Sequence, residues 1–337
     1  MPSRESRVPS SESRHLNGIL LLDKPPGLSS NQALQVARRI FQADKGGHTG
    51  SLDPLATGLL PICFGEATKL AGLLLGEAKS YSARAILGAT TDTDDADGAV
   101  LRRRPVPLLT DAMIGAALAP LRGRISQRPP IYSALKRDGE PMYAKARRGE
   151  TIQIDEREVD VQRLVVVDRG PTWLQLEIDC GSGTYVRSLV RDLGETIGCG
   201  AHVSVLRRLW VEPFRAPRMW TLSELQALAA PDPALANAAD GDPDFSRLDA
   251  CLLPIETGLA GLPAMRLDPA QALLLAQGKS QHIGNCDAIG TLAVFDQAGR
   301  ALGLARRDTD GTLRAQRLFT WAAALAETSS RSAAGSR

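Results

Sequence analysis

A glycine-rich stretch in the N-terminal part of the chain holds the side chains best suited to chemistry. Residues 46–58 read Gly-Gly-His-Thr-Gly-Ser-Leu-Asp-Pro-Leu-Ala-Thr-Gly, which places four glycines, one histidine and one carboxylate within thirteen residues. Such glycine density disfavours helix and strand interiors and predicts a shaped loop. An isolated Asp-Pro is usually a turn. A loop carboxylate can also be a covalent nucleophile on a sugar or base carbon, and Asp53 is the candidate for that role.

A second candidate, Arg187, follows an expected strand at 173–180 and a Gly181-Ser182-Gly183 turn. A carboxylate nucleophile must stay ionised in a dry pocket, and a neighbouring guanidinium favours the charged form. The alternative is an ordinary surface arginine on a first helical turn, although a cation there opposes the helix dipole.

The Gly181-Ser182-Gly183 turn before a helix could also cradle a phosphate, which keeps a nucleotide-dependent enzyme open as an alternative. Position 186 is valine where a dinucleotide fingerprint has its third glycine, and no P-loop Lys-Ser/Thr follows.

The elements that must position these residues are expected on both sides of the glycine-rich stretch. The apolar run at 18–22 predicts a buried strand, and Ser29 or Ser30 caps a helix to about Gln42. Residues 65–69 begin another helix. Further strands are expected at 81–87, 159–168 and 173–180, and helices at 110–121 and from the turn to about Ile197. Residues 92–98 hold four aspartates, but the EF-hand register would put Thr93 and Arg104 at ligand positions, so a polar Asx-type turn is expected.

Length and composition limit the class of protein. The 337 residues suggest two domains, and the net charge of +2 does not by itself imply a nucleic-acid partner. Basic clusters such as Arg207-Arg208 are more often solvated faces than phosphate contacts. The five cysteines are widely spaced without a CxxC pair, which argues against a disulfide framework and a zinc site. No signal peptide or membrane-length apolar run is found, so we expect a cytoplasmic protein. We also expect no metal, because the cysteines lack the spacing of a zinc site.

Several segments stand apart from the expected core. Residues 1–14 and 328–337 are expected to be disordered, and 231–246 reads as a surface insertion or linker. A smaller β-rich unit begins near Leu262, with a helix at 268–276 and a hairpin of strands 291–295 and 301–305. The segment 128–152 interleaves lysines and arginines with Tyr132 and Tyr143. Its residues fit a surface hairpin and an RNA-facing flap equally well.

The loop pattern His-Thr-Gly-x-Leu-Asp-Pro-x-Ala-x-Gly resembles the catalytic loop of the TruB-type pseudouridine synthases, in which this aspartate is the nucleophile. The resemblance extends from about Asn17 to the end of the small unit. It is carried further by Leu22-Asp23-Lys24-Pro25, by Tyr81, by Gly183-Thr184-Tyr185-Val186-Arg187, by Leu206, and by Tyr132-Ser133-Ala134-Leu135-Lys136, which is similar to the family's thumb insertion.

The resemblance implies an α+β fold with a mixed, largely antiparallel central sheet flanked by helices. It implies a catalytic domain at 15–250 with a thumb-like insertion at about 128–152, and a PUA-like RNA-binding domain at 262–325. The implied activity is isomerisation of uridine 55 in the tRNA T-loop to pseudouridine, by base flipping, with no metal or organic cofactor. The expected partner is the tRNA T-arm stem-loop, and a monomer would suffice for one tRNA.

Site roles follow from the same resemblance. Asp53 would attack the base or the sugar, an alternative that the residues leave open, and Arg187 would keep it ionised. Substrate contacts are expected from His48 with the thumb, Tyr81 stacking on the flipped base, Leu206 packing against it, and Tyr185, Lys24 and Pro25. A different class also remains open: an RNA-binding or RNA-folding protein whose contacts matter more than its turnover.

Overall fold

The computed structural model describes residues 13–76, 78–133, 136–137, 140–141, 148, 154–230, 245–284 and 287–324. Most of the expected leader and of the thumb-like insertion lies outside the described residues. So do nearly all of 231–246 and the whole of 328–337.

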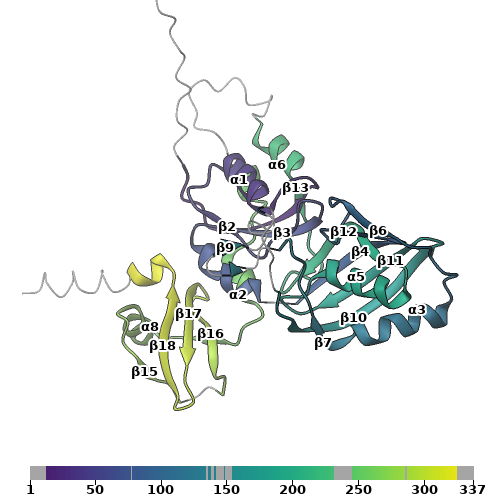
Figure 1. Ribbon diagram of the computed structural model, residues 1–337. Coiled ribbons are helices and arrows are strands. Elements are labelled where there is room, and N and C mark those ends of the chain that lie inside the picture. Colours follow the sequence, from purple (N-terminus) through teal and green to yellow (C-terminus); the bar gives the residue numbers. More distant parts are fainter. Residues whose placement is uncertain are drawn as a thin grey trace, which may run out of the picture.

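A nine-stranded sheet organises the larger part of the chain (Figure 1). Its strand order is β13-β1-β3-β12-β4-β11-β10-β7, with β2 paired to β3. The pairings β1–β13 and β3–β12 are parallel, and the others are antiparallel. The predicted mixed, largely antiparallel sheet is therefore confirmed. The strands are β1 (Gly18–Lys24), β2 (Gly46–His48), β3 (Thr57–Phe64), β4 (Lys79–Leu87), β7 (Gly123–Gln127), β10 (Arg157–Gly170), β11 (Trp173–Cys180), β12 (Ala201–Val211) and β13 (Trp220–Thr221).

Residue patterns explain these strands and the helices beside them. β1 and β3 are almost continuously apolar and buried, whereas β11 alternates buried and half-buried positions as a one-sided strand does. Ser29 caps α1 (Ser30–Phe41) in a reciprocal capping box with Gln32. α5 (Val186–Ile197) packs on β12 and ends at Gly198 in the left-handed region. The remaining elements around the sheet are η1 (Gly65–Leu70), α2 (Ala71–Leu75), β5 (Ala89–Thr91), β6 (Val100–Arg103), α3 (Asp111–Leu118), η2 (Ala119–Leu121), β8 (Lys136–Arg137), β9 (Glu140–Pro141), α6 (Leu222–Ala229), α7 (Ser246–Asp249) and η3 (Ile255–Leu259).

One local expectation was wrong. Residues 46–48 form the short edge strand β2 on β3, and β3 itself begins at Thr57, so the loop is confined to residues 49–56. Glycine is tolerated in β2 because it is a three-residue edge strand without a second neighbour. The helix expected to begin at 65–69 is present: it opens as the 3-10 helix η1 and continues as α2.

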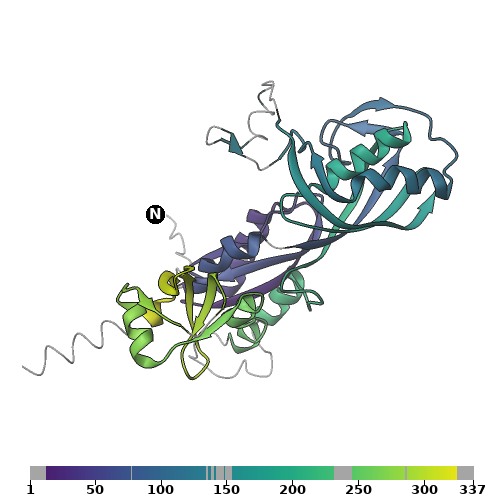
Figure 2. The ribbon, with the colours of Figure 1, turned by 90° about the horizontal axis from the view of Figure 1, so that it is seen from below.

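A separate small sheet forms the C-terminal domain, coloured light green to yellow in Figures 1 and 2. Its order is β14-β16-β17-β18-β15, and the predicted hairpin is the antiparallel pair β16–β17. The elements are β14 (Ala264–Arg266), α8 (Pro269–Ala276), β15 (Gln281–His282), β16 (Gly290–Phe295), β17 (Ala301–Arg307) and β18 (Thr312–Leu318). Asp268 caps α8, as expected.

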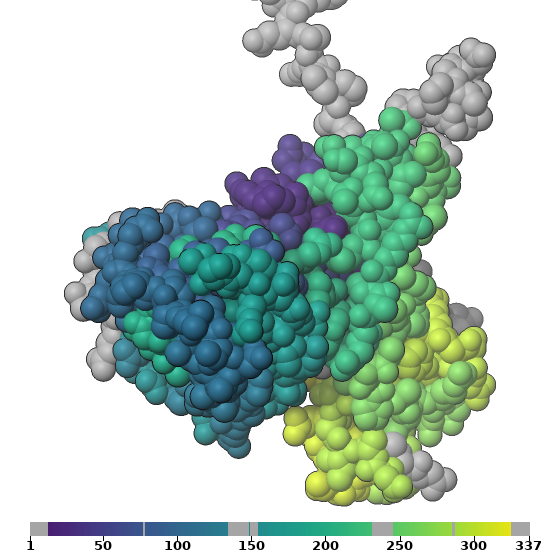
Figure 3. All heavy atoms as spheres, turned by 90° about the vertical axis from the view of Figure 1, so that its right-hand side faces the viewer, coloured from purple at the N-terminus to yellow at the C-terminus, as the bar shows by residue number. Residues whose placement is uncertain are grey.

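The two sheets share an apolar cluster, and Figure 3 shows the small domain packed against the larger part. The cluster joins buried residues of β1, β3, η1 and α2 to Ala293, Ala301, Leu304 and Phe319 of the small domain. Two hydrogen bonds also connect the larger part to the small domain. Lys69 Nζ donates to the Leu318 carbonyl at 2.8 Å, and the Thr320 amide donates to Glu66 at 2.6 Å. We call these residues the interdomain cluster.

Candidate active site

A pocket of about 420 Å³ lies where the glycine-rich loop meets β4, β12 and the start of α5. Of the residues predicted from the sequence, it brings together Asp53, Tyr81, Tyr185, Arg187 and Leu206. His48, Lys24 and Pro25 are not among its lining residues. The complete lining is residues 50–53, Leu75, Lys79, Tyr81, Arg157, residues 181–187, Leu206 and Arg208.

The ion pair expected from the sequence is present in the pocket. Arg187 Nε lies 2.9 Å from Asp53 Oδ2; the arginine side chain is 5% exposed and the aspartate side chain 41% exposed. Burial raises the pKa of Asp53 above its ordinary 3.8, and the charge of Arg187 opposes that rise. Arg187 therefore limits the protonation of Asp53 that burial would otherwise cause. An ordinary surface arginine, the alternative reading of this position, is excluded by its burial.

The loop at 92–98 holds Arg187, a role that the sequence did not reveal. Arg187 Nη1 donates to the Thr93 carbonyl at 2.8 Å and lies 3.5 Å from Asp95 Oδ2, while Nη2 donates to the Tyr132 carbonyl at 2.9 Å. The loop is the expected Asx-type turn, since Asp95 Oδ1 accepts from the Asp97 amide. Asp95 is 4% exposed, so its carboxylate faces the protein interior, on the side of Arg187, and not the solvent.

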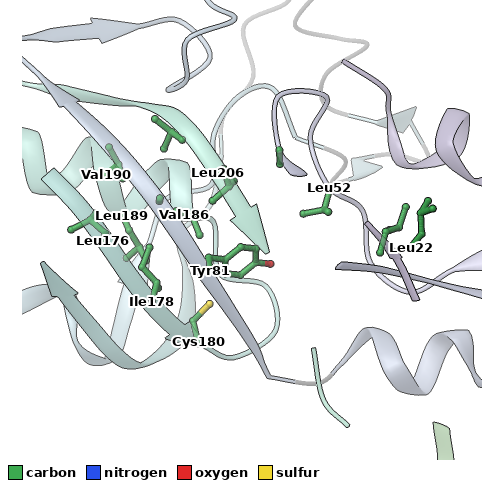
Figure 4. Packing of buried hydrophobic residues seen from close by; sticks show 14 of the residues in the cluster. Leu22, Leu52, Tyr81, Leu176, Ile178, Cys180, Val186, Leu189, Val190 and Leu206 are labelled. Carbon is green, nitrogen blue, oxygen red and sulfur yellow. The ribbon is translucent and has the colours of Figure 1, made fainter. Parts of the chain in front are cut away.

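Tyr81 and Leu206 form the apolar wall of the pocket. They lie on the antiparallel neighbours β4 and β12, where Leu206 pairs with Ala83 and Arg208 pairs with Tyr81. Their exposures are 8% and 6%. Figure 4 shows the Tyr81 ring beside Leu206, with the hydroxyl directed toward the side where Leu52 lies. Burial raises the pKa of Tyr81, which keeps the phenol protonated near neutral pH.

Tyr185 lies at the N-terminus of α5 and is fixed by a reciprocal pair of bonds. Its amide donates to Gln127 Oε1 at 2.8 Å, and Gln127 Nε2 donates back to the Tyr185 carbonyl at 3.1 Å. Burial raises the pKa of the Tyr185 hydroxyl, and a hydrogen bond with Ser133 opposes the rise. These bonds join β7 to the start of α5 and hold the tyrosine at the pocket.

Lys24 and Pro25 lie beside the loop at residues 49–56. The Lys24 side chain is fully buried, and Nζ donates to the carbonyls of Pro25 at 2.8 Å, Leu28 at 2.6 Å and Pro54 at 3.4 Å. Burial lowers the pKa of Lys24 to about 8, although the nearby Asp53 charge raises it. The ammonium thus ties the turn after β1 to the residue that follows Asp53. The contacts of Lys24 and Pro25 position the loop, and their predicted substrate contact stays a prediction.

His48 lies on β2, half-buried and outside the pocket lining. Burial and the charge of Arg208 lower the pKa of His48, so the imidazole is neutral at physiological pH. Its predicted contact with the RNA loop stays a prediction.

The pair Arg207-Arg208, expected to be a solvated face, is not one. Arg207 forms a bidentate pair with Asp23, with N–O distances of 2.9 and 2.7 Å. Arg208 is 1% exposed and reaches the pocket. Strand β12 alternates its side chains between the two faces of the sheet, which separates these neighbours.

Two kinds of feature are absent from the described part of the chain. No three histidine, cysteine, aspartate or glutamate side chains cluster there in a way that would hold a metal ion. No helix in the same residues is long and apolar enough to cross a membrane.

Solved structures with a similar fold contain the protein Cbf5. The chain superposes on a chain of a Cbf5-Nop10-Gar1 complex with a TM-score of 0.68 and 21% identity, covering 90% of this chain and 85% of the other. A chain of the archaeal box H/ACA sRNP Nop10-Cbf5 complex gives a TM-score of 0.66 at 20% identity, covering 91% and 88%. At these identities the likeness shows the fold.

Sequence relatives carry the assignment further. The family model described as TruB family pseudouridylate synthase (N terminal domain) matches residues 38–186, and two TruB C-terminal models match residues 187–260 and 263–319. The tRNA pseudouridine synthase B of Xanthomonas axonopodis pv. citri is 58% identical, with 91% of this chain and 95% of the relative covered. That of Pseudomonas fluorescens is 44% identical, with 91% and 96% covered. The chain therefore belongs to the TruB family of pseudouridylate synthases, which are isomerases.

Proposed function

We propose that this chain isomerises uridine 55 in the T-loop of tRNA to pseudouridine, with Asp53 as the nucleophile. The observation that carries the proposal is the Asp53–Arg187 pair, 2.9 Å apart, in a pocket walled by Tyr81 and Leu206. The relatives named tRNA pseudouridine synthase B, at 58% identity, support tRNA as the substrate.

The pocket geometry suggests how the reaction proceeds. A volume of about 420 Å³ fits a single nucleotide and not a folded RNA loop, so the target uridine must leave its stack. Tyr81 stacks on the flipped base and Leu206 packs against it. Asp53 then attacks as a carboxylate, and Arg187 holds that ionised form. The glycosidic bond breaks, the base rotates within the pocket, and a carbon–carbon bond replaces the carbon–nitrogen bond. The covalent bond to Asp53 is broken again, which frees the carboxylate. The base carbon that joins the sugar loses its proton, and the ring nitrogen that left the sugar gains one. Because the product is an isomer of the substrate, the reaction needs no co-substrate.

The test is pseudouridine formation in an unmodified tRNA T-arm stem-loop, with wild type and Asp53→Asn compared and no cofactor added. Product at the T-loop uridine with wild type, and none with Asp53→Asn, supports both the reaction and the nucleophile. Absence of product from folded wild type, on the stem-loop and on full-length tRNA, would instead favour an RNA-binding or RNA-folding protein. Such a protein would keep its full effect on tRNA folding in the Asp53→Asn variant.

We also propose the T-arm stem-loop as the partner, bound by one copy of the chain in the cytoplasm. The domain limits 15–250 and 262–325, and the RNA-facing role of 128–152, stay predictions. If cations of that segment contact phosphates, RNA affinity falls steeply with salt because counterions are released. A flat response between low and physiological ionic strength would count against the thumb assignment.

A further inference from the structure

The pocket carries more positive charge than the proposed mechanism uses. Its charged lining residues are one carboxylate, Asp53, and four cations, Lys79, Arg157, Arg187 and Arg208. The carboxylate offsets one of the four cations through its pair with Arg187 and leaves the other three without a counter-charge in the lining. A uracil ring is neutral and does not compensate them, and burial of uncompensated cations is costly. The surplus therefore indicates that the ligand of the pocket includes an anionic group.

Three of the four cations are deeply buried and are held by acceptors of the protein. Arg187, Arg208 and Lys79 are 4%, 1% and 7% exposed. Arg187 pairs with Asp53, and the other two donate to backbone carbonyls, at 2.7 Å for Arg208 Nε and 3.1 Å for Lys79 Nζ. These side chains contribute positive potential to the pocket, but their donors are already engaged.

Arg157 differs from these three cations in burial and in partners. Its side chain is half-buried, so it is the cation of the lining that lies nearest the mouth of the pocket. Its Nε is buried without a hydrogen-bond partner. Within the described ranges of the chain, no carboxylate lies within ion-pair distance of its guanidinium. Arg157 is therefore the cation of the pocket whose donors are available to a ligand.

The sheet fixes the place of Arg157 in the pocket. It is the first residue of β10, and its cross-strand partner on β7 is Gln127. Directly opposed side chains of an antiparallel pair lie on the same face. The Gln127 side chain bonds to both backbone groups of Tyr185, at 2.8 and 3.1 Å. Arg157 therefore lies on the Tyr185 side of the pocket, on a strand that is anchored to the start of α5.

We propose that Arg157 binds a phosphodiester flanking the flipped uridine, at the mouth of the pocket. This inference rests on the proposed function, because it takes the ligand to be one nucleotide of an RNA chain. The anionic group of such a nucleotide is its phosphodiester, which stays in the backbone at the mouth when the base enters. A guanidinium presents two parallel N–H donors that match phosphate oxygens. Arg157 thus holds the backbone while Tyr81 and Leu206 hold the base.

The first test measures equilibrium binding of the T-arm stem-loop, with Asp53→Asn as the parent so that bound RNA is not converted. Adding Arg157→Gln should raise Kd by about tenfold. It should also reduce the slope of log Kd against log salt by about 0.7–1, the counterion release of one phosphate contact. The matched control is Arg163→Gln, on the same strand, because Arg163 pairs with Glu177 at 2.7 Å outside the pocket lining. That control should keep Kd within about twofold, and an unchanged salt slope in Arg157→Gln would overturn the proposal.

A neutral phosphate analogue identifies the contacted group. Stem-loops carry a single methylphosphonate 5′ of the target uridine, 3′ of it, or in the stem. At one of the two flanking positions the analogue should weaken binding by the parent about tenfold, and should cost the Arg157→Gln variant at most about twofold. The analogue in the stem should cost both proteins the same. Losses that simply multiply at both flanking positions would rule the contact out.

Two more substitutions separate the charge from packing. Arg157→Met keeps an apolar stem and removes the charge, so its Kd should match that of Arg157→Gln. Arg157→Lys keeps a cation and should recover at least about threefold of the lost affinity. Parent-like binding by Arg157→Met would reduce Arg157 to a packing residue and refute the inference. Wild type that forms no pseudouridine on the stem-loop or on full-length tRNA, yet shows the methylphosphonate coupling, refutes the proposed function alone.

Discussion

From the interdomain cluster we predict how much the loss of one buried side chain lowers the free energy of unfolding of the whole chain. Phe319, in the small domain, is 0% exposed and belongs to the same cluster as Leu70 of η1, also 0% exposed. Its ring lies 4.9 Å from that of Trp321, centroid to centroid. We expect Phe319→Ala to cost about 3–5 kcal/mol, the usual price of removing a fully buried phenylalanine ring.

The resulting melting shift depends on which part unfolds. If all 337 residues unfold as one unit, the entropy of unfolding is about 0.7 kcal/mol per kelvin and the midpoint falls by only about 4–7 °C. If the small domain of about 60 residues unfolds by itself, the same loss lowers its own midpoint by about 24–40 °C. Because the cluster is shared, we expect the first result: one transition, slightly lowered.

The assay is calorimetry of wild type and Phe319→Ala, together with amide hydrogen exchange in β16 and β17. The matched variant is Leu70→Ala, on the other side of the same cluster, which should lower the same single transition and speed exchange in those small-domain strands. A separate low-temperature transition in Phe319→Ala, or small-domain exchange that ignores Leu70→Ala, would refute the shared core.

Three further predictions concern the site. Arg187→Gln should lower kcat about a hundredfold or more at neutral pH, because Asp53 loses the charge that limits its protonation; single-turnover rates at saturating RNA decide this, and a loss confined to KM would contradict it. The activity of wild type should fall at acid pH as Asp53 becomes protonated, and this fall should lie above the ordinary pKa of 3.8 for that carboxyl. The activity should also fall near pH 8 as Lys24 loses its proton, and Lys24→Met should abolish this alkaline fall. Asp95→Asn should move the acid limb to lower pH, since the Asp95 charge raises the pKa of Asp53, while kcat drops about tenfold as Arg187 loses an anchor; an unchanged profile and kcat would exclude this role.

Local signals in the sequence located most elements because their causes are local. The caps at Ser29 and Asp268 start helices where they were expected, since each cap bonds to an amide three residues away. The alternation in 81–87 and 173–180 likewise gives the strands β4 and β11. The wrong prediction also has a local cause. Residue propensity assigned the glycines of 46–48 to a loop, but a short edge strand accepts them.

The site was only partly predictable. Residue types and a family pattern singled out Asp53 and Arg187, but the contacts that hold the arginine come from positions 94 and 55 residues away in the chain. The propensities of single residues carry no information about contacts between positions so far apart in the chain. For the same reason Arg208 looked like part of a solvated basic cluster, although pairing of β12 with β3 and β4 buries it.

The sheet pairings explain how the Asp53–Arg187 pair is assembled. Asp53 is held from the β1 side, by Lys24 through Pro54 and by Ser30, whose hydroxyl exchanges bonds with Leu52 at 2.7 and 3.1 Å. Arg187 is held from the other side, by α5 and the loop at 92–98. These two halves of the sheet meet where β3 pairs with β12, through the residue pairs 57–207 and 58–208.

Gly58 therefore lies in this β3–β12 seam, between the half of the sheet that holds Asp53 and the half that holds Arg187. Its φ is +96°, and a Cβ at this position would lie 2.2 Å from the Arg208 carbonyl oxygen, so no side chain fits without parting the strands. The same pairing carries Arg208 between Gly50 and Tyr81. The short seam thus joins the two halves of the sheet that hold the Asp53–Arg187 ion pair, and it borders the pocket through Arg208, although Gly58 is not among the lining residues.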